Sequence, residues 1–195
     1  MVALVVGLGN PGPEYAATRH NAGQMVVAEL ARRGGVTLSA HKAHARAATV
    51  RIGTVAGSPG PAAIIAAPLS YMNVSGGPVS ALAKYHAVEA TAVIVIHDDL
   101  DLPFGTVKLK RGGGDGGHNG LKDITKALGT ADYVRVRVGI GRPPGRQDPA
   151  EFVLKPFGTA EGKEVPWLID TAADAVEAMV TDGLEAAQQR FHTAG

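Results

Sequence analysis

Short apolar runs alternate along this chain with segments whose apolar residues recur at helical spacing. Residues 1–9 are largely β-branched and apolar and end at a glycine-rich turn, which is typical of a strand buried on both faces. The same reasoning predicts further strands over residues 45–55, 62–67, 92–96, 106–111 and 133–140, with a hairpin tip at 57–61 between the first two. Helical spacing predicts helices over residues 21–34, 75–85 and 121–128, and a mainly helical segment from 158 to 190.

Strands that interleave with helices are typical of the α/β class. We therefore expect a three-layer sandwich in which a mixed, mostly parallel twisted sheet is flanked by helices. The chain has 195 residues, which fit one domain over residues 1–195 and are enough to bury a sizeable core. Within it, residues 112–120 are rich in glycine but lack the Gly-Lys-Ser/Thr ending of a P-loop, so we interpret this stretch as a mobile lid.

The composition excludes several classes of protein. Hydrophobic residues make up 45% and charged residues 19%, which is too apolar for a disordered chain and not charged enough for a coiled coil. The absence of cysteine excludes disulfides, thiolate metal sites and a cysteine nucleophile. We find neither a signal peptide with a basic start nor an apolar run of about 20 residues, and we therefore expect a cytoplasmic protein without a membrane segment.

The formal net charge of +1 conceals an uneven distribution along the chain. Residues 104–146 contain 9 Lys or Arg against 3 Asp or Glu, whereas residues 147–195 contain 3 against 9. A basic block of this kind suits a partner that carries phosphates, although a solvated face opposite the chain's own acidic helices would give the same count.

The motif Gly-Leu-Gly-Asn-Pro-Gly at residues 7–12 matches the dinucleotide fingerprint. Pro11 and Pro13 have no backbone N–H to offer a pyrophosphate, and they disfavour a helix that begins at once. The acidic residue about 20 positions downstream would be Glu29, which falls inside a predicted helix. We therefore expect no nucleotide cofactor.

A polar cluster, Tyr-x-x-Thr-Arg-His-Asn-x-Gly at residues 15–23, follows this turn. His20 within it could merely cap or pack the next helix. However, Asn10 and Asp98 follow two predicted strands, and open α/β folds place their sites at that edge of the sheet. An aspartate beside a histidine fixes the imidazole tautomer and favours its protonated form, which suits general-base catalysis.

Several other polar residues allow two interpretations each. Asn10, Asn73 and Asn119 could form turns or caps, or their amides could hold a carbonyl group or a water. Lys108 and Lys110 lie on the same face of a predicted strand, where they could bind an anion or protect a solvated edge.

Metal binding and nucleophilic catalysis find little support in the sequence. The cluster His97, Asp98, Asp99 and Asp101 contains metal-binding residue types, but strand alternation points His97 and Asp98 to opposite faces. No serine lies in a G-x-S-x-G elbow. We therefore expect no metal and no protein nucleophile.

Together, five motifs resemble those of bacterial-type peptidyl-tRNA hydrolases: Gly-Leu-Gly-Asn-Pro-Gly at 7–12, Tyr-x-x-Thr-Arg-His-Asn-x-Gly at 15–23, Tyr-Met-Asn at 71–73, His-Asp-Asp-Leu-Asp at 97–101 and Gly-Gly-His-Asn-Gly-Leu-Lys-Asp at 116–123. The resemblance covers essentially the whole chain. It implies a monomeric, metal-independent cytoplasmic enzyme that hydrolyses the ester between a peptide and the terminal ribose of tRNA. The alternative from another class is a catalytically silent RNA-binding partner protein on the same fold.

The resemblance also implies roles for individual residues. His20 would be the general base that activates water, Asp98 would orient and stabilise it, and Asn10 would help to distinguish a blocked peptidyl ester from a free aminoacyl ester. The residues that would line the substrate site are Tyr15, Tyr71, Met72, Asn73, His118 and Asn119. The residues that would grip tRNA phosphates are Lys108, Lys110 and Arg137, with Arg135 as the alternative to Arg137. Gln24 departs from the family pattern, which often has an apolar or aromatic residue there, and this puts a local packing contact in doubt.

Overall fold

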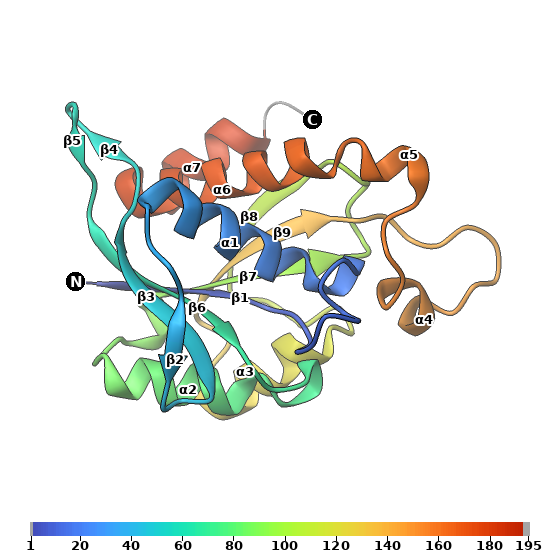
Figure 1. The fold of residues 1–195 in the computed structure, drawn as a ribbon, viewed down its shortest axis with the longest axis horizontal. Helices are drawn as coiled ribbons and strands as arrows, with labels where there is room; N and C mark the ends of the chain where they lie inside the picture. Colours follow the sequence, from blue (N-terminus) through green and yellow to red (C-terminus); the bar gives the residue numbers. More distant parts are fainter. Residues whose placement is uncertain (1, 193–195) are drawn as a thin grey trace.

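The structure is a computed structural model that describes residues 2–192. Its main sheet has seven strands in the order β2-β3-β6-β1-β7-β9-β8 (Figure 1). Their bounds are β1 Ala3–Gly7, β2 Ser39–His41, β3 Ala45–Arg51, β6 Ala62–Pro68, β7 Val93–Asp99, β8 Val107–Arg111 and β9 Val134–Gly139. The central strands β6, β1, β7 and β9 are parallel to one another, while β3 and β8 run antiparallel to their neighbours. The predicted mixed, mostly parallel sheet is confirmed.

Helices cover both faces of the sheet. They are α1 Ala22–Gly34, α2 Gly76–Tyr85, α3 Asn119–Leu128, α4 Pro149–Val153, α5 Thr159–Gly162, α6 Val165–Asp182 and α7 Leu184–His192. In Figure 1, α1, α6 and α7 lie on one side of the sheet, and α2 and α3 lie on the other. Residues of β7 alternate between the two layers: Ile94 and Ile96 join the core with α1 and α6, and Val93 and Val95 join the core with α2 and α3. The predicted three-layer sandwich is therefore confirmed.

Two glycines allow α1 to lie unusually close to the sheet. A Cβ added to Gly23 would lie 2.2 Å from the carbonyl oxygen of Ile96, and one added to Gly7 would lie 2.1 Å from the carbonyl oxygen of Gly23. No other residue type fits such an approach without a backbone shift. The start of α1 is thereby held against the carboxyl ends of β1 and β7, where the site residues gather.

The structure corrects several predicted boundaries. β7 continues through His97, Asp98 and Asp99, so the acidic run belongs to the strand instead of following it. The predicted strand over 45–55 ends at Arg51, and its last residues form β4, Thr54–Val55, which pairs with β5, Ser58–Pro59. The hairpin tip therefore lies at residues 56–57, earlier than the predicted turn, because Ala56 and Gly57 both adopt positive φ.

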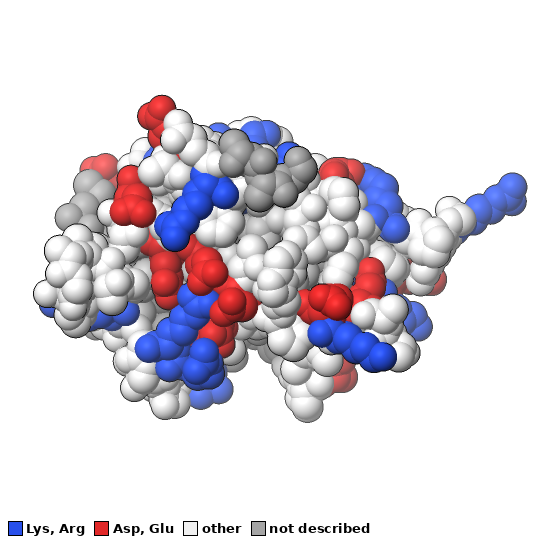
Figure 2. Space-filling model, turned by 90° about the horizontal axis from the view of Figure 1, so that it is seen from above, with Lys and Arg blue, Asp and Glu red and all other residues white. Residues whose placement is uncertain are grey.

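The surface of the α1 and α6 layer carries interlocking ion pairs. Arg33 in α1 contacts Asp170, Asp174 and Glu177 in α6, and also Glu29 one turn earlier in its own helix. Figure 2 views this side of the molecule and shows acidic and basic side chains gathered next to one another. These hydrogen bonds raise the pKa of Arg33, despite its partial burial, and the two neighbouring arginines lower the pKa of Glu29 to about 2. Among residues 2–192, no helix is both long and apolar enough to cross a bilayer.

Candidate active site

A cavity of about 880 Å³ opens where β1 and β7 end and α3 begins. Most of the residues singled out in the sequence line it: Asn10, His20, Tyr71, Met72, Asn73, Asp98, Lys110, His118, Asn119 and Arg137. Tyr15 and Lys108 are not among the lining residues. Tyr15 instead packs edge-on against Tyr71, with ring centroids 6.3 Å apart. The structure therefore brings together residues that are more than a hundred positions apart in the chain.

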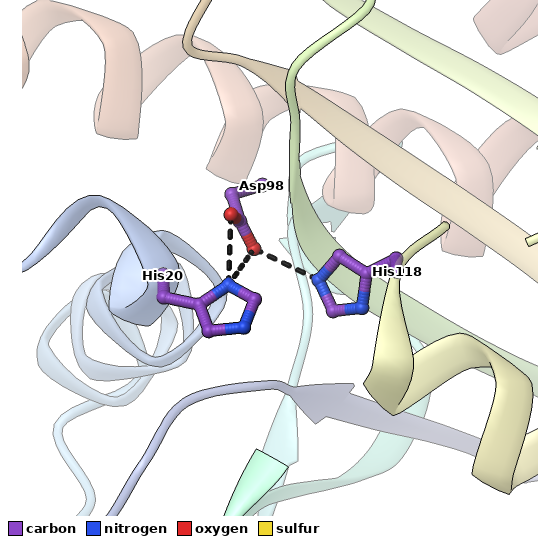
Figure 3. A group of neighbouring side chains, drawn as sticks. All are labelled: His20, Asp98 and His118. Atoms are coloured by element: carbon purple, nitrogen blue, oxygen red, sulfur yellow. Dashed lines mark hydrogen bonds and ion pairs between the residues drawn. The ribbon is translucent and has the colours of Figure 1, made fainter. Parts of the chain in front are cut away.

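His20 and Asp98 form the central pair of this cavity (Figure 3). His20 Nδ1 lies 3.0 Å from Asp98 Oδ1 and 2.9 Å from Asp98 Oδ2. Because both oxygens are acceptors, Nδ1 carries the proton and donates it to the carboxylate. The lone pair is then on Nε2 of a ring that lines the cavity and is 12% exposed. A histidine in this tautomer can take a proton from a water molecule in the cavity.

His118 is the second donor to Asp98. Its Nε2 lies 2.9 Å from Asp98 Oδ1, and its Nδ1 accepts hydrogen bonds from the backbone N–H groups of Gly120 at 3.1 Å and Leu121 at 3.4 Å. These two donors require an unprotonated Nδ1, so the ring is fixed as the Nε2–H tautomer. His118 is thus the N-cap of α3. The sequence had left a capping role open for Asn119, but Asn119 is the first residue of the helix itself.

The environment of Asp98 keeps it ionised. Its burial, at 3% exposure, raises the pKa of the carboxyl group, but the neighbouring His20 and His118 outweigh burial and hold the pKa well below its usual range. A buried carboxylate can then stabilise a positive charge that forms on His20. The described residues contain one group with metal-ligand spacing, and it is His20, Asp98 and His118. Both imidazoles present N–H groups to the carboxylate, so this arrangement fits a hydrogen-bonded triad better than a metal site.

The run His97 to Asp101 is divided among different partners. Asp99 pairs with Arg137 at 2.8 Å and Asp101 pairs with Arg142 at 2.6 Å, so neither contributes its carboxylate to the Asp98 cluster. His97 bonds through Nδ1 to the backbone oxygen of Asp98 at 2.8 Å. Burial and the nearby His118 lower the pKa of His97 to about 4, so this ring is neutral at pH 7.

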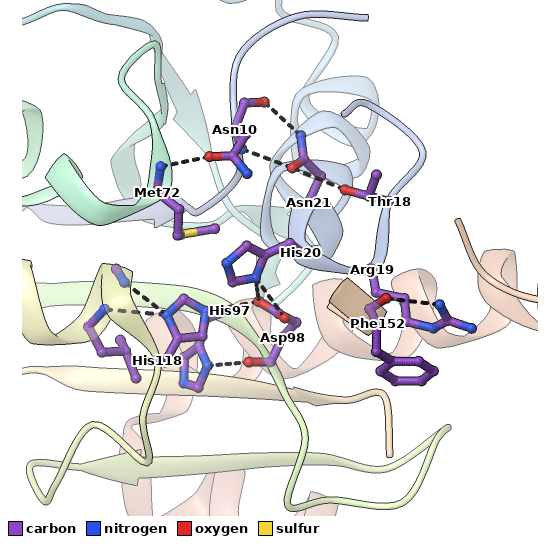
Figure 4. Close-up of polar contacts among 12 residues, drawn as sticks. Asn10, Thr18, Arg19, His20, Asn21, Met72, His97, Asp98, His118 and Phe152 are labelled. Atoms are coloured by element: carbon purple, nitrogen blue, oxygen red, sulfur yellow. Dashed lines mark hydrogen bonds and ion pairs between the residues drawn. The ribbon is translucent and has the colours of Figure 1, made fainter. Parts of the chain in front are cut away.

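Asn10 is held in one orientation by its surroundings (Figure 4). Its Oδ1 accepts a hydrogen bond from the backbone N–H of Met72 at 2.7 Å, and its backbone N–H and C=O both bond to the Asn21 amide, at 2.9 and 3.0 Å. Since the N–H of Met72 can only donate, the amide oxygen of Asn10 must face it. The NH₂ group is left to act as a donor toward the cavity.

Arg19, next to His20, anchors the 3₁₀ turn Arg19–Asn21 to α4 and to the segment that follows it. Its guanidinium donates to the carbonyl oxygen of Phe152 at 3.1 Å, pairs with Glu161 at 3.2 Å and lies 3.8 Å from the centroid of the Phe152 ring. Its backbone N–H also bonds to the carbonyl oxygen of Lys155 at 3.1 Å. These contacts fix the backbone that carries His20.

Gln24 takes part in a polar contact rather than an apolar one. Its amide donates to the carbonyl oxygens of Gly9 at 3.3 Å and Pro68 at 3.1 Å. It therefore links the turn after β1 to the end of β6, which resolves the packing doubt that the sequence raised.

The two candidate arginines for phosphate contact differ in their surroundings. Arg135 is 2% exposed and donates to the carbonyl oxygens of Gly113 and Gly114, so it holds the glycine-rich loop in place. Arg137 is paired with Asp99, but its side chain is 25% exposed. Arg137 is therefore the more accessible of the two for an incoming anion.

Comparison with known proteins agrees with these features. The family model described as peptidyl-tRNA hydrolase matches residues 4–195. The chain belongs to the peptidyl-tRNA hydrolase family. A peptidyl-tRNA hydrolase of Kineococcus radiotolerans is 63% identical over 97% of this chain and 96% of its own length. A peptidyl-tRNA hydrolase from an Arthrobacter strain is 60% identical over 98% of this chain and 96% of its own length. A crystal structure of peptidyl-tRNA hydrolase from Acinetobacter baumannii is 36% identical, with a TM-score of 0.86 over 97% of this chain and 94% of its own.

One wall of the cavity in this chain is not predicted from the sequence. Residues of α4 and its flanks line it: Asp148, Pro149, Ala150, Val153 and Leu154. Asp148 is the N-cap of α4, and its side chain accepts from the Ala150 N–H at 3.1 Å. An aspartate followed by a proline is a recognised helix start and could have revealed this element.

Proposed function

We propose that this chain hydrolyses the ester bond of peptidyl-tRNA and releases a peptide and free tRNA. The observation that carries this proposal is the His20 ring, which lines the cavity and is bound through Nδ1 to the buried Asp98 carboxylate, so that Nε2 is left with the lone pair. Membership of the peptidyl-tRNA hydrolase family supports the choice of substrate.

In the proposed reaction a water molecule attacks the carbonyl carbon of the ester. His20 Nε2 takes one proton from the water as the new C–O bond forms, and the buried Asp98 carboxylate stabilises the resulting imidazolium. The bond between this carbonyl carbon and the 3′ oxygen of the ribose then breaks, and His20 returns its proton to that oxygen. Water supplies all the atoms that are added, so the step needs neither a protein nucleophile nor a cofactor.

Three amides would assist the reaction at different points. Asn10 presents its NH₂ group, which can donate to a carbonyl oxygen of the peptide and so favour a blocked ester over a free aminoacyl ester. Asn73 and Asn119 are exposed residues of the same cavity, where one can stabilise the oxyanion and the other can position the water. Tyr71 and Met72 would contact the apolar parts of the substrate. Tyr15, which packs edge-on against the Tyr71 ring, would hold that ring in position.

The tRNA would be held mainly through its phosphates. Lys110 and Arg137 line the cavity, and Lys108 lies on the same face of β8 as Lys110. Contacts of this kind provide affinity without reading the base sequence, which suits an enzyme that accepts many tRNAs.

We further propose that the chain works in the cytoplasm as a monomeric single domain, without a metal, and with residues 112–120 as a lid.

The test is release of the N-acetyl amino acid from N-acetyl-aminoacyl-tRNA, with and without chelator, beside unblocked aminoacyl-tRNA. The proposal expects chelator-resistant cleavage of the blocked ester alone. Intact, salt-sensitive tRNA binding without cleavage would overturn it in favour of a silent RNA-binding protein. Cleavage that stops with chelator would overturn the metal-independent mechanism.

A further inference from the structure

A long stretch of this chain contains no acidic residue. Between Glu29 and Glu89 there is neither Asp nor Glu, although the stretch contains Arg32, Arg33, Lys42, Arg46, Arg51 and Lys84 and the histidines His41, His44 and His86. Lys42, His44, Arg46 and Lys84 are all exposed. They lie in the turn between β2 and β3, at the start of β3 and at the end of α2, away from the active-site cavity.

Three rings pack together where this turn meets the end of α2. The Tyr85 ring makes edge contacts with His41 and His86, each with centroids 4.7 Å apart, and Lys42 Nζ lies 4.7 Å from the Tyr85 centroid. Tyr85 nevertheless remains 57% exposed. Burial and the nearby His41 lower the pKa of His86, which favours a neutral ring. We call Lys42, Lys84, Tyr85, His41 and His86 the distal cluster.

The two helical layers differ in charge. α2 has Lys84 as its one charged residue, and the one carboxylate of α3, Asp123, is occupied by the backbone N–H of Gly76 at 2.8 Å. α3 also carries the exposed Lys122 and Lys126. The opposite layer, by contrast, contains the acidic residues of α6 that pair with Arg33. Of the two layers, the α2 and α3 side is therefore the one suited to a polyanion.

The distal cluster lies on the same side of the sheet as the proposed phosphate contacts. Val107 and Leu109 of β8 pack in the core with α6 and α7, so Lys108 and Lys110 project from the opposite face. β2 and β8 are the two edge strands of the sheet, and six strand spacings of about 4.8 Å separate them by roughly 29 Å. The lysines of α3 and α2 lie between these two edges.

We propose that the distal cluster is a second contact for the substrate tRNA and binds the body of the tRNA beyond its acceptor end. The inference rests on the proposed function and extends it from the cavity to the far edge of the sheet. Lys42 and Lys84 contact phosphates, and the exposed Tyr85 ring stacks on an unpaired base. An aromatic ring beside lysines is the combination that proteins use to bind unpaired nucleotides.

The test compares two blocked substrates, full-length N-acetyl-aminoacyl-tRNA and a hairpin that contains only the acceptor stem. A Lys42→Ala/Tyr85→Ala double variant should lose about 10-fold in kcat/KM on the full-length substrate and change less than about twofold on the hairpin. Its salt dependence with full-length tRNA should flatten by about one unit of slope, because one phosphate contact is removed. Tyr85→Phe keeps the stacking surface and should behave as the wild type.

Two controls separate this proposal from the one on which it rests. Lys110→Ala should weaken both substrates, and Lys163→Ala, an exposed lysine in the acidic layer, should weaken neither. The distal contact is wrong if the double variant lowers kcat/KM equally for both substrates. It is also wrong if the double variant leaves kcat/KM unchanged for both substrates while Lys110→Ala still lowers it. In either case the phosphate contacts at β8 stand. If Lys110→Ala also has no effect, the phosphate contacts at β8 fail as well.

Discussion

Replacing Asp98 with asparagine changes one atom and should reverse the tautomer of the proposed base. The Asp98 carboxylate accepts from both His20 Nδ1 and His118 Nε2, whereas a carboxamide has a single oxygen acceptor. His118 cannot change its tautomer, because its Nδ1 already accepts from two backbone N–H groups of α3. The oxygen of the asparagine would therefore take the place of Oδ1, which faces His118 and also lies 3.0 Å from His20 Nδ1, and its NH₂ group would take the place of Oδ2, 2.9 Å from His20 Nδ1.

An NH₂ group 2.9 Å from Nδ1 repels an N–H there and favours the tautomer in which Nδ1 accepts, which moves the ring proton to Nε2. Nε2 would then be unable to take a proton from water, and the charge that stabilises the imidazolium would also be gone. We expect turnover to fall by about 10³-fold or more, which corresponds to about 4 kcal/mol of transition-state stabilisation.

The assay is single-turnover hydrolysis of N-acetyl-aminoacyl-tRNA with enzyme in excess, together with tRNA affinity for each variant. Affinity should stay near the wild-type value, since Asp98 is buried and does not contact phosphate. Asp174→Asn, the same change on the outer face of α6, serves as the control. If Asp98→Asn keeps more than about a tenth of wild-type turnover, the proposed coupling of His20 to Asp98 is refuted.

Further predictions follow from the packing and charge of other regions. Gly23→Ala places a Cβ 2.2 Å from the carbonyl oxygen of Ile96, so both Tm and kcat should fall; unchanged kcat would show that the position of α1 does not matter for His20. Arg33→Ala should cost about 1–2 kcal/mol in urea unfolding because the three carboxylates of α6 lose their partner, whereas Arg32→Ala, with a 72% exposed side chain, should cost clearly less; equal costs would contradict the network. His97 has its pKa lowered to about 4, so its neutral form stabilises the fold above pH ~6.5 and this contribution is lost as pH falls toward 4. Urea unfolding at pH 7 and pH 4.5 should show a smaller difference for His97→Gln than for the wild type, and an equal difference would contradict the assignment.

The sequence predicts the regular parts of the fold well, because apolar periodicity records burial directly. Strands such as β1 and helices such as α1 have the required patterns. β2, Ser39–His41, was missed because it has three mainly polar residues and forms only as an edge partner of β3. β7 was predicted too short because His97 and the two aspartates that follow look like a loop, although His97 and Asp98 are buried in the strand.

The sequence predicts which residues belong to the candidate site, but it does not predict the hydrogen bonds that they make. The positions of His20, Asp98 and Asn10 at strand and helix ends indicate proximity, and the structure confirms that they share one cavity. Spacing cannot show that His118 caps α3 and bonds to Asp98, because both contacts depend on how the glycine-rich loop folds back over β9. The carbonyl oxygens of the same loop accept the hydrogen bonds of Arg135, so this guanidinium is already occupied within the chain.

The most direct test of the central claim is hydrolysis of N-acetyl-aminoacyl-tRNA by His20→Ala, measured beside its binding of uncharged tRNA. The account predicts that turnover falls by about 100-fold or more, because the water loses its base, while binding stays within about twofold of wild type. Near-normal turnover by a folded His20→Ala protein would contradict the account and remove His20 from the mechanism.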